Sequence, residues 1–205
     1  MSPAQRWRSR RHLLDGKIAA TLRIDKSLRD GIRLADKAGS EILYRYILAT
    51  DDIDLITAML HDAYAPLAAR GMRFVASHQD ARMTRRRMAR GETIVADDQG
   101  TIVGVVTLKR ASDSHGSPFY QRPDVAGFGQ FAVRPSYQHR GIGATLLKLV
   151  EQRAAEQGVR QLALDTSEHA TDLIQFYESK GFTFVEHLQW PEVNYRSVVL
   201  AKKLA

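Results

Sequence analysis

The hydrophobic pattern separates an irregular first stretch of the chain from a well-patterned remainder. Between about residues 13 and 37, apolar residues recur at four-residue steps, but Gly31 interrupts the repeat and it is never sustained. We therefore expect residues 1–43 to form an N-terminal extension that is mobile or marginally helical. Residues 44–205 are expected to form the folded domain.

From residue 41 onward, the pattern predicts strands alternating with helices. Expected strands lie at 41–50, 93–96, 102–108, 126–133, 162–164, 182–185 and 194–201, and expected helices at 50–69, 79–90, 138–158 and 169–180. The helix at 138–158 separates two of these strands, which favours a parallel pair between 126–133 and 162–164. The strands at 93–96 and 102–108 are joined by a short turn and favour antiparallel pairing, as do those at 182–185 and 194–201. The sequence predicts a mixed α/β fold.

Composition narrows the class of protein. A chain of 205 residues with 44% hydrophobic and 26% charged residues is typical of one globular domain. No stretch approaches the 18 or so apolar residues of a membrane span, and no apolar signal core follows the first arginines, so we expect a cytoplasmic protein without a membrane partner. The chain has no cysteine, which excludes disulfides and an acyl-thiol enzyme, and its seven histidines are scattered, so no metal is expected.

The charge is unevenly distributed. The chain carries a formal net charge of +7, and residues 1–40 hold ten Lys or Arg against four Asp or Glu. The remaining residues are nearly balanced, so nucleic-acid binding is unlikely for the body of the protein. The basic N-terminal arm is either an electrostatic contact for RNA or an acidic partner, or an extension without a role.

A glycine-containing turn lies where the strand at 126–133 is followed by the helix that begins near residue 141. Backbone N–H groups at a helix start lack helical partners and attract anions such as a pyrophosphate, and glycine lets a phosphate approach the backbone. The alternative is a close-packed turn without a ligand. The residues of this candidate coenzyme loop are Gln138, His139, Arg140, Gly141, Ile142, Gly143 and Ala144.

A second candidate is Tyr177, near the end of the helix at 169–180. Its hydroxyl is the only neutral-pH proton donor in the motif formed by residues 176–182. The alternative is a core tyrosine whose hydroxyl has a structural partner.

Together, in this order and spacing, the two motifs resemble the GNAT superfamily of acetyl-CoA-dependent N-acetyltransferases. Gln138, Gly141 and Gly143 match the family's first motif, and the Tyr177 and Gly181–Phe182 positions match its second. The resemblance covers roughly residues 44–205. It implies a mostly antiparallel central sheet with a splayed parallel strand pair, flanked by helices, and it implies acetyl-CoA as co-substrate.

The resemblance also implies roles for individual residues. The backbone of Phe131, Ala132 and Val133 would bind the pantetheine arm, and N–H groups of the coenzyme loop would bind the pyrophosphate. An amine would attack the thioester directly, with a backbone N–H near Ala132 stabilising the oxyanion and Tyr177 protonating the departing thiolate. We thus expect an acyltransferase that acetylates a primary amine of a small molecule or protein.

The sequence departs from the family pattern at two positions. Ala170 stands where many members have an asparagine that contacts the pantetheine, and Gln130 stands where relatives can hold a carboxylate base. A general base is therefore not assigned, and the amine needs none if it arrives deprotonated. The remaining candidate bases are Glu92, Asp124, His115 and His169.

The acceptor is not encoded in a recognisable motif. Five arginines between positions 82 and 90 form either a solvated helix face or a wall for an acidic substrate or a nucleic-acid backbone. His61, Tyr64 and Trp190 are candidates to line the acceptor cleft. Alternative functions are a CoA-binding regulatory or RNA-associated module with little catalysis, and a toxin-like acetyltransferase acting on charged tRNA. A homodimer is possible because relatives are often dimers.

Overall fold

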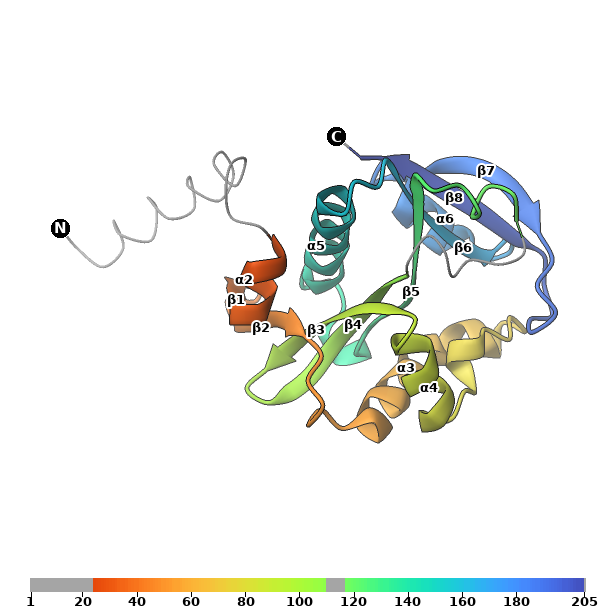
Figure 1. Cartoon of the computed structure of the whole chain (residues 1–205). Helices are drawn as coiled ribbons and strands as arrows, with labels where there is room; N and C mark the ends of the chain where they lie inside the picture. The colour runs from red at the N-terminus through yellow and green to blue at the C-terminus, as the bar shows by residue number, and fades with distance from the viewer. Residues whose placement is uncertain (1–23, 110–116, 205) are drawn as a thin grey trace.

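The structure, a computed structural model, describes residues 24–109 and 117–204 (Figure 1). The strands of its sheet are β1 (Ile32–Ala35), β2 (Glu41–Tyr46), β3 (Gly91–Asp98), β4 (Thr101–Lys109), β5 (Val125–Val133), β6 (Gln161–Ser167), β7 (Thr183–Leu188) and β8 (Ser197–Lys203). The helices are α2 (Ile24–Asp30), α3 (Ile53–Ala69), α4 (Ala81–Met88), α5 (Ile142–Glu156) and α6 (Thr171–Glu178), with 3-10 turns η1 (Val75–Ser77) and η3 (Pro135–Tyr137).

The strands lie in the order β1-β2-β3-β4-β5-β6-β8-β7. The β5–β6 pair is parallel and the other neighbouring pairs are antiparallel. The predicted mixed α/β fold, with a mostly antiparallel sheet and one parallel pair, is therefore confirmed.

Helices cover both faces of the sheet. Figure 1 shows α5 on one side and α3 with α4 on the other. Successive side chains of strand β3 point to opposite faces of the sheet and so contribute to the packing of helices on both faces. Ile94 and Ala96 are buried in the core that includes α5, while Val95 is buried against α3. Helix α3 begins at a side-chain cap, where the Asp52 carboxylate accepts hydrogen bonds from the N–H groups of Asp54 and Leu55.

Residues 24–43 differ from the expected extension. Leu28 of α2 is fully buried in the main core, β1 pairs with β2, and β2 in turn pairs with β3. The four-residue repeat was misleading because Gly31, in a left-handed conformation with φ of +82°, ends the helix and starts a strand. The apolar positions on either side of Gly31 belong to different elements. Residues 1–23, which carry most of the expected arm, lie outside the described residues.

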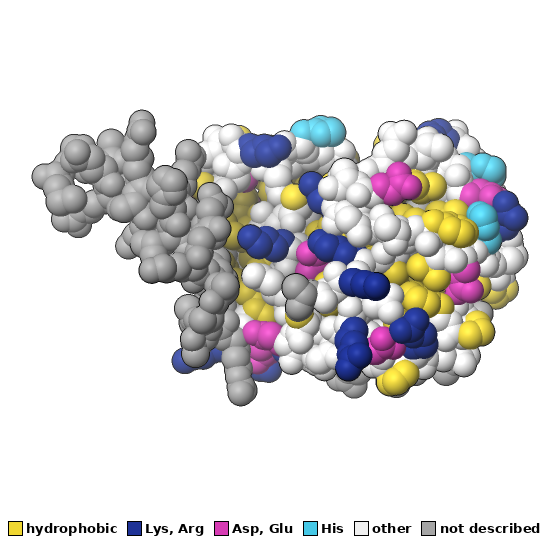
Figure 2. All heavy atoms as spheres, turned by 90° about the horizontal axis from the view of Figure 1, so that it is seen from above, with side chains coloured by type: hydrophobic (Ala, Val, Ile, Leu, Met, Phe, Trp, Pro, Cys, Tyr) yellow, Lys and Arg dark blue, Asp and Glu magenta, His cyan; other side chains and the backbone are white. Residues whose placement is uncertain are grey.

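The surface of the described residues carries mixed charge. On the face shown in Figure 2, Lys and Arg side chains lie among Asp and Glu side chains. Within residues 24–109 and 117–204, no helix has the length and apolar character needed to cross a membrane. The same residues contain no group of three or more His, Asp or Glu side chains that could hold a metal ion.

Candidate functional site

The parallel strand pair opens partway along its length. Pairing between β5 and β6 runs from Val125 opposite Gln161 to Gly127 opposite Ala163 and then stops. Beyond that point β5 still pairs with β4 as far as Val133, and β6 still pairs with β8 as far as Ser167. The residues from Phe128 to Val133 therefore have one strand edge that β6 does not cover. This is where the sequence placed Phe131, Ala132 and Val133 as a pantetheine-binding edge.

A bulge in β5 marks the start of the opening. Gln130 has a positive φ of +47°, and the register of β5 on β4 shifts beside it. Its buried side-chain oxygen accepts a hydrogen bond from Gln79 at 2.8 Å. Gln130 is thus held by the core next to α4, and its amide serves a structural network in place of a base.

The candidate coenzyme loop lies at the end of β5 and the start of α5. Two of its residues, His139 and Gly141, adopt positive φ values of +61° and +90°, and α5 begins at Ile142. Within the described part of the chain, the backbone N–H groups of residues 139–144 donate to no protein acceptor outside regular structure, as expected at a helix start. These groups, together with the positive end of the α5 dipole, form an anion-binding geometry.

The side chains of Gln138 and Arg140 in the coenzyme loop bind other parts of the protein. Gln138 donates from its side chain to the carbonyl of Val133 at 3.1 Å, which ties the loop to the end of β5. Arg140, another residue of the loop, donates to the carboxylate of Asp36 at 2.6 Å and to the hydroxyl of Ser40 at 2.8 Å. Its guanidinium also lies 4.4 Å from the centre of the Tyr137 ring.

Gly143 leaves space beside the open edge of β5. A Cβ atom added there would lie 3.5 Å from both the Phe131 ring and the Val133 side chain. The missing side chain therefore leaves the space between α5 and the β5 edge free at the point where a ligand bound by the loop would continue along the strand.

Tyr177 lies in an aromatic cluster on the other side of Phe131. Its ring centre is 6.0 Å from that of Phe128 and 6.4 Å from that of Phe131, and the residue is only 7% exposed. Burial raises the pKa of the Tyr177 hydroxyl well above its usual value, and the nearby charge of Asp165 adds to the effect. The hydroxyl therefore keeps its proton at neutral pH, as a proton donor must.

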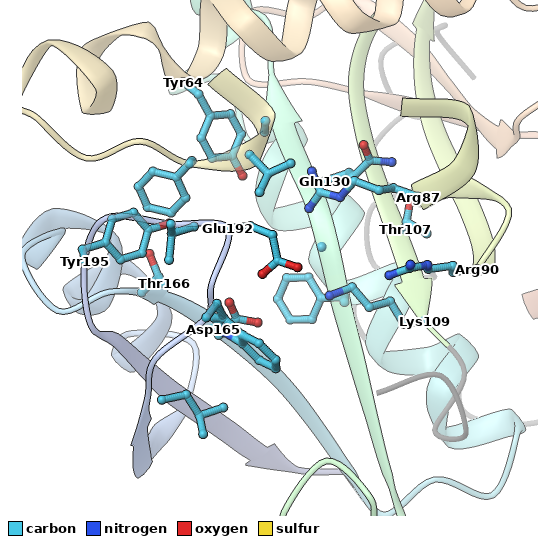
Figure 3. A pocket seen from close by; sticks show the side chains of 18 of the residues that line it. Tyr64, Arg87, Arg90, Thr107, Lys109, Gln130, Asp165, Thr166, Glu192 and Tyr195 are labelled. Carbon is cyan, nitrogen blue, oxygen red and sulfur yellow. The ribbon is translucent and has the colours of Figure 1, made fainter. Parts of the chain in front are cut away.

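Tyr177 lines a cavity of about 600 Å³. Figure 3 shows Tyr64 and Tyr195 on one side of this cavity and the cations Arg87, Arg90 and Lys109 on another. The remaining polar and aromatic lining includes Arg86, Tyr120, Asp165, Thr166, Gln189, Trp190 and Glu192. The cavity thus extends from the opening of the sheet, and charged side chains of both signs line it.

Two of the three expected cleft residues line the cavity. Tyr64 and Trp190 line the cavity, and the Tyr64 hydroxyl donates to the carbonyl of Phe131 at 3.1 Å. His61 is not part of the lining, since its ring nitrogen Nε2 is hydrogen-bonded to the carbonyl of Gln79 at 2.7 Å. Ala170 is the buried N-cap residue of α6, and its side chain makes no capping hydrogen bond.

The three candidate bases among the described residues do not line the cavity. Glu92 is engaged by Arg153 at 2.6 Å and Asp124 by Arg122 at 2.8 Å, and both have lowered pKa values. For Glu92, burial raises the pKa, but hydrogen bonds and the charge of Arg153 outweigh it. His169 is exposed on the surface, and His115 lies outside the described residues.

Several cavity residues had not been singled out by the sequence, and Lys109 and Asp165 are two charged examples. Lys109 ends β4 and Asp165 lies near the end of β6, and each is a charged residue at the border of an apolar strand. This position is the signal that the sequence contains, because a charged residue at the end of a strand can bind a ligand where the strand faces an opening of the sheet. Which strand ends share the opening depends on the strand order, and the sequence did not supply that order.

Comparison with known proteins adds the family. Residues 58–182 match the model of the acetyltransferase (GNAT) family. The S-(2-succino)cysteine N-acetyltransferase of Bacillus subtilis is 28% identical over 141 residues, which cover 67% of this chain and 83% of that protein.

Solved structures agree at the level of the fold. The GNAT domain of S. lividans PAT has a TM-score of 0.64 at 20% identity, covering 85% of this chain and 97% of that one. A GNAT family acetyltransferase from Elizabethkingia anophelis, with acetyl-CoA bound, has a TM-score of 0.56 at 17% identity, covering 80% and 98%. The family match spans more than half of the chain, and with the strand order and the open β5 edge it leads to one conclusion: this protein belongs to the acetyltransferase (GNAT) family and is an N-acetyltransferase.

Proposed function

We propose that this protein transfers an acetyl group from acetyl-CoA to a primary amine of a small molecule. The observation that carries the proposal is the position of Phe131, which lies between the coenzyme loop and Tyr177. The edge of its ring lies beside Gly143, and the ring also packs in the cluster that holds Tyr177. A ligand that runs along the β5 edge would therefore extend from the helix start to a buried proton donor.

The residues present fit acetyl-CoA. The N–H groups of residues 139–144 suit a pyrophosphate, and the uncovered edge of Phe131, Ala132 and Val133 suits the amide groups of a pantetheine arm. Acetyl-CoA supplies the activated thioester, and the protein's contribution is to orient it. Arg140 contributes by fixing the loop through Asp36.

The proposed transfer forms an N–C bond and breaks the C–S bond. A backbone N–H near Ala132 would stabilise negative charge on the thioester oxygen, a contribution worth about 2.7–4 kcal/mol in comparable sites. The Tyr177 hydroxyl would give its proton to the leaving sulfur, and the proton that the attacking nitrogen loses as the amide forms would return to Tyr177. The amine that attacks must first be neutral, so its ammonium proton has to leave before or during attack.

Asp165 is the residue that we propose to receive this proton, directly or through water. It lines the same cavity as Tyr177, on the β6 side of the opening. The Tyr120 hydroxyl lies 3.5 Å from one of its carboxylate oxygens, which orients the group. A carboxylate at this place would compensate for the absence of an acid at position 130.

The size of the cavity supports a small-molecule acceptor. Its volume of about 600 Å³ falls in the range of small-molecule sites. The Bacillus subtilis relative is named for an acceptor of this size, S-(2-succino)cysteine. This compound is the first acceptor to test.

The test combines calorimetry with thiol release. We expect acetyl-CoA and CoA to bind, and S-(2-succino)cysteine or another amine in a broad panel to release CoA. Because the chain has no cysteine, a thiol reagent reports CoA without background from the protein. Tyr177→Phe should lower kcat by about 10²- to 10⁴-fold, with the Kd of acetyl-CoA changed by no more than about twofold.

Tyr195→Phe is the matched control, because Tyr195 also lines the cavity and its pKa is likewise raised by burial. It should leave kcat within about threefold of the starting protein, since its hydroxyl has no role in protonating the sulfur. Absence of heat with both CoA and acetyl-CoA would remove the proposed function. Full activity in Tyr177→Phe would remove Tyr177 from the mechanism but leave acetyl transfer standing.

A further inference from the structure

Three of the four cations that line the cavity within the described residues, all but Arg86, lie on one side of it (Figure 3). Arg87 and Arg90 come from α4 and the turn after it, and Lys109 comes from the end of β4. Figure 3 shows all three on the same side of the cavity, and we refer to them as the cationic wall. Arg87 is anchored through a hydrogen bond from its guanidinium to the side-chain oxygen of Gln79.

The cationic wall lacks an acidic partner within the described residues. Elsewhere in the fold, half-buried arginines are matched by carboxylates, as Arg45 is by Asp51 at 2.8 Å and Arg153 by Glu92 at 2.6 Å. In residues 24–109 and 117–204, no carboxylate lies within 4.0 Å of a charged nitrogen of the cationic wall.

Burial and like charge both act against the charged forms of Lys109 and Arg87. Burial lowers the pKa of Lys109 below its usual value, and the charges of Arg87 and Arg90 lower it further, while Asp165 opposes them. Burial also lowers the pKa of Arg87. Cations gathered in a cavity under these conditions are stabilised when an anion binds between them.

Strand β5 makes room for the lysine. A Cβ atom added to Gly129 would lie 3.1 Å from Cε and 3.3 Å from Nζ of Lys109. A side chain at position 129 would displace the ammonium from the β5 edge. The glycine thus brings a cation against the strand whose next residues are proposed to hold the thioester.

The cavity also contains polar atoms without protein partners. Among the described residues, Oγ1 of Thr166 and Nε1 of Trp190 are buried without a hydrogen bond, and both residues line the cavity. Thr166 is only 3% exposed. Unsatisfied buried groups of this kind are satisfied when a polar ligand binds.

The wall opposite the cations carries the acids Asp165 and Glu192. A ligand that fits both walls has an ammonium or amine at one end and anionic groups at the other. The three cations of the cationic wall come from separate backbone positions. We expect this spacing to favour a ligand with two separate carboxylates over one compact dianion such as a phosphate.

We propose that the cationic wall selects an acceptor amine that carries at least two carboxylates, such as an amino acid with an acidic side chain. This inference rests on the proposed function and names the acceptor class of the same site. Arg90 and Lys109 bind the carboxylates, Arg87 adds charge from its anchored position, and the acceptor's amine lies towards Asp165.

The test uses pairs of acceptors that differ by one charge. The pairs are aspartate and asparagine, glutamate and glutamine, and S-carboxymethylcysteine and S-carbamoylmethylcysteine, assayed by CoA release. We expect the carboxylate member of a pair to have a kcat/KM higher by about tenfold or more, expressed mainly in KM. Lys109→Met and Arg90→Met should each reduce that ratio to about threefold or less while leaving the Kd of acetyl-CoA unchanged.

Arg85→Met is the matched control. Arg85 is an exposed arginine of α4 that does not line the cavity, so the variant loses the same charge from the same helix. It should keep the full carboxylate preference. Equal rates for both members of each pair, a preference for the amides or for O-phosphoserine, or an equal loss in Arg85→Met would each overturn the inference.

A binding measurement decides the case in which none of these amines is acetylated. S-carboxymethylcysteine is titrated by calorimetry into the protein saturated with CoA. Binding that is lost in Lys109→Met and kept in Arg85→Met supports the inference, and absence of binding, or equal binding in both variants, overturns it. The Kd of acetyl-CoA, measured separately, tells a failure of the proposed function apart from a failure of the cationic wall.

Discussion

The coenzyme loop and the cationic wall are both assigned to anions in our proposals, but they offer different groups. The loop offers backbone N–H groups at the start of α5, while the side chains of Gln138 and Arg140 bind other parts of the protein. The cationic wall offers side chains from α4, the turn after it and β4. A site made of backbone depends on local conformation, and a site made of side chains depends on tertiary convergence. The two should therefore respond differently to substitution.

Gly143→Val should have the largest effect on the coenzyme loop, because a branched side chain would fill the space beside Phe131 and Val133. Overpacking of this kind costs about 1–3 kcal/mol, so the Kd of acetyl-CoA should rise by roughly tenfold to a hundredfold. Isothermal calorimetry measures the change, and the melting temperature checks the fold. Gly143→Ala is the control and should stay within about fivefold, because its Cβ makes only ordinary contacts. Unchanged affinity in the valine variant would contradict the proposed path of the ligand.

The same contrast explains what the sequence could predict. The loop is encoded by consecutive residues at a strand-to-helix transition, and the parallel pairing of β5 with β6 follows from the helix between them, so both could be expected from the sequence. The cavity could not be predicted, because Lys109 and Asp165 are 56 positions apart and meet only through the order β4-β5-β6. Residues 24–43 were misjudged for a related reason, since a single backbone conformation at Gly31 separates α2 from β1. The roles of the site residues stay predictions.

Asp36→Ala tests whether the loop depends on a remote anchor. The Asp36 carboxylate is fully buried, accepts N–H groups from Ala38 and Ser40 at 2.9 Å, and holds the guanidinium of Arg140. Its loss should lower the free energy of unfolding by about 2 kcal/mol and weaken acetyl-CoA binding by about tenfold, because Arg140 loses its partner.

Chemical denaturation and calorimetry measure these two changes for Asp36→Ala. Glu41→Ala is the control, because Glu41 pairs with Arg33 in an exposed position of the same hairpin. Loss of stability without any loss of coenzyme affinity would show that the anchor has no influence on the loop.

Lys109→Arg examines the cationic wall through pH. Burial, with Arg87 and Arg90, lowers the pKa of Lys109, so its positive charge is lost at a lower pH than for an ordinary lysine, although Asp165 opposes the shift. Carboxylate binding should therefore weaken as pH rises through that pKa, whereas a guanidinium stays charged. As the pH rises from neutrality towards the ordinary lysine pKa of about 10.4, the kcat/KM for S-carboxymethylcysteine of the starting protein should fall by a few-fold relative to that of Lys109→Arg.

The ratio of the two pH profiles removes the ionisation of the acceptor amine, which affects both proteins equally. Tyr177 does not enter the ratio either, since its raised pKa keeps it protonated across this range. Parallel profiles would mean that the charge of Lys109 does not contribute to acceptor binding.

The smallest effect is expected at His139, where the loop should tolerate a change of side chain. His139 is exposed and has a φ of +61°, a conformation that glycine adopts without steric cost. In His139→Gly the relief of strain is offset by the greater freedom of the unfolded chain, so the free energy of unfolding should change by less than about 1 kcal/mol. The Kd of acetyl-CoA should stay within about twofold, because only the backbone N–H of residue 139 is proposed to bind. A large loss of affinity would show that the imidazole itself binds the coenzyme, and the loop would then resemble the cationic wall in using side chains for recognition.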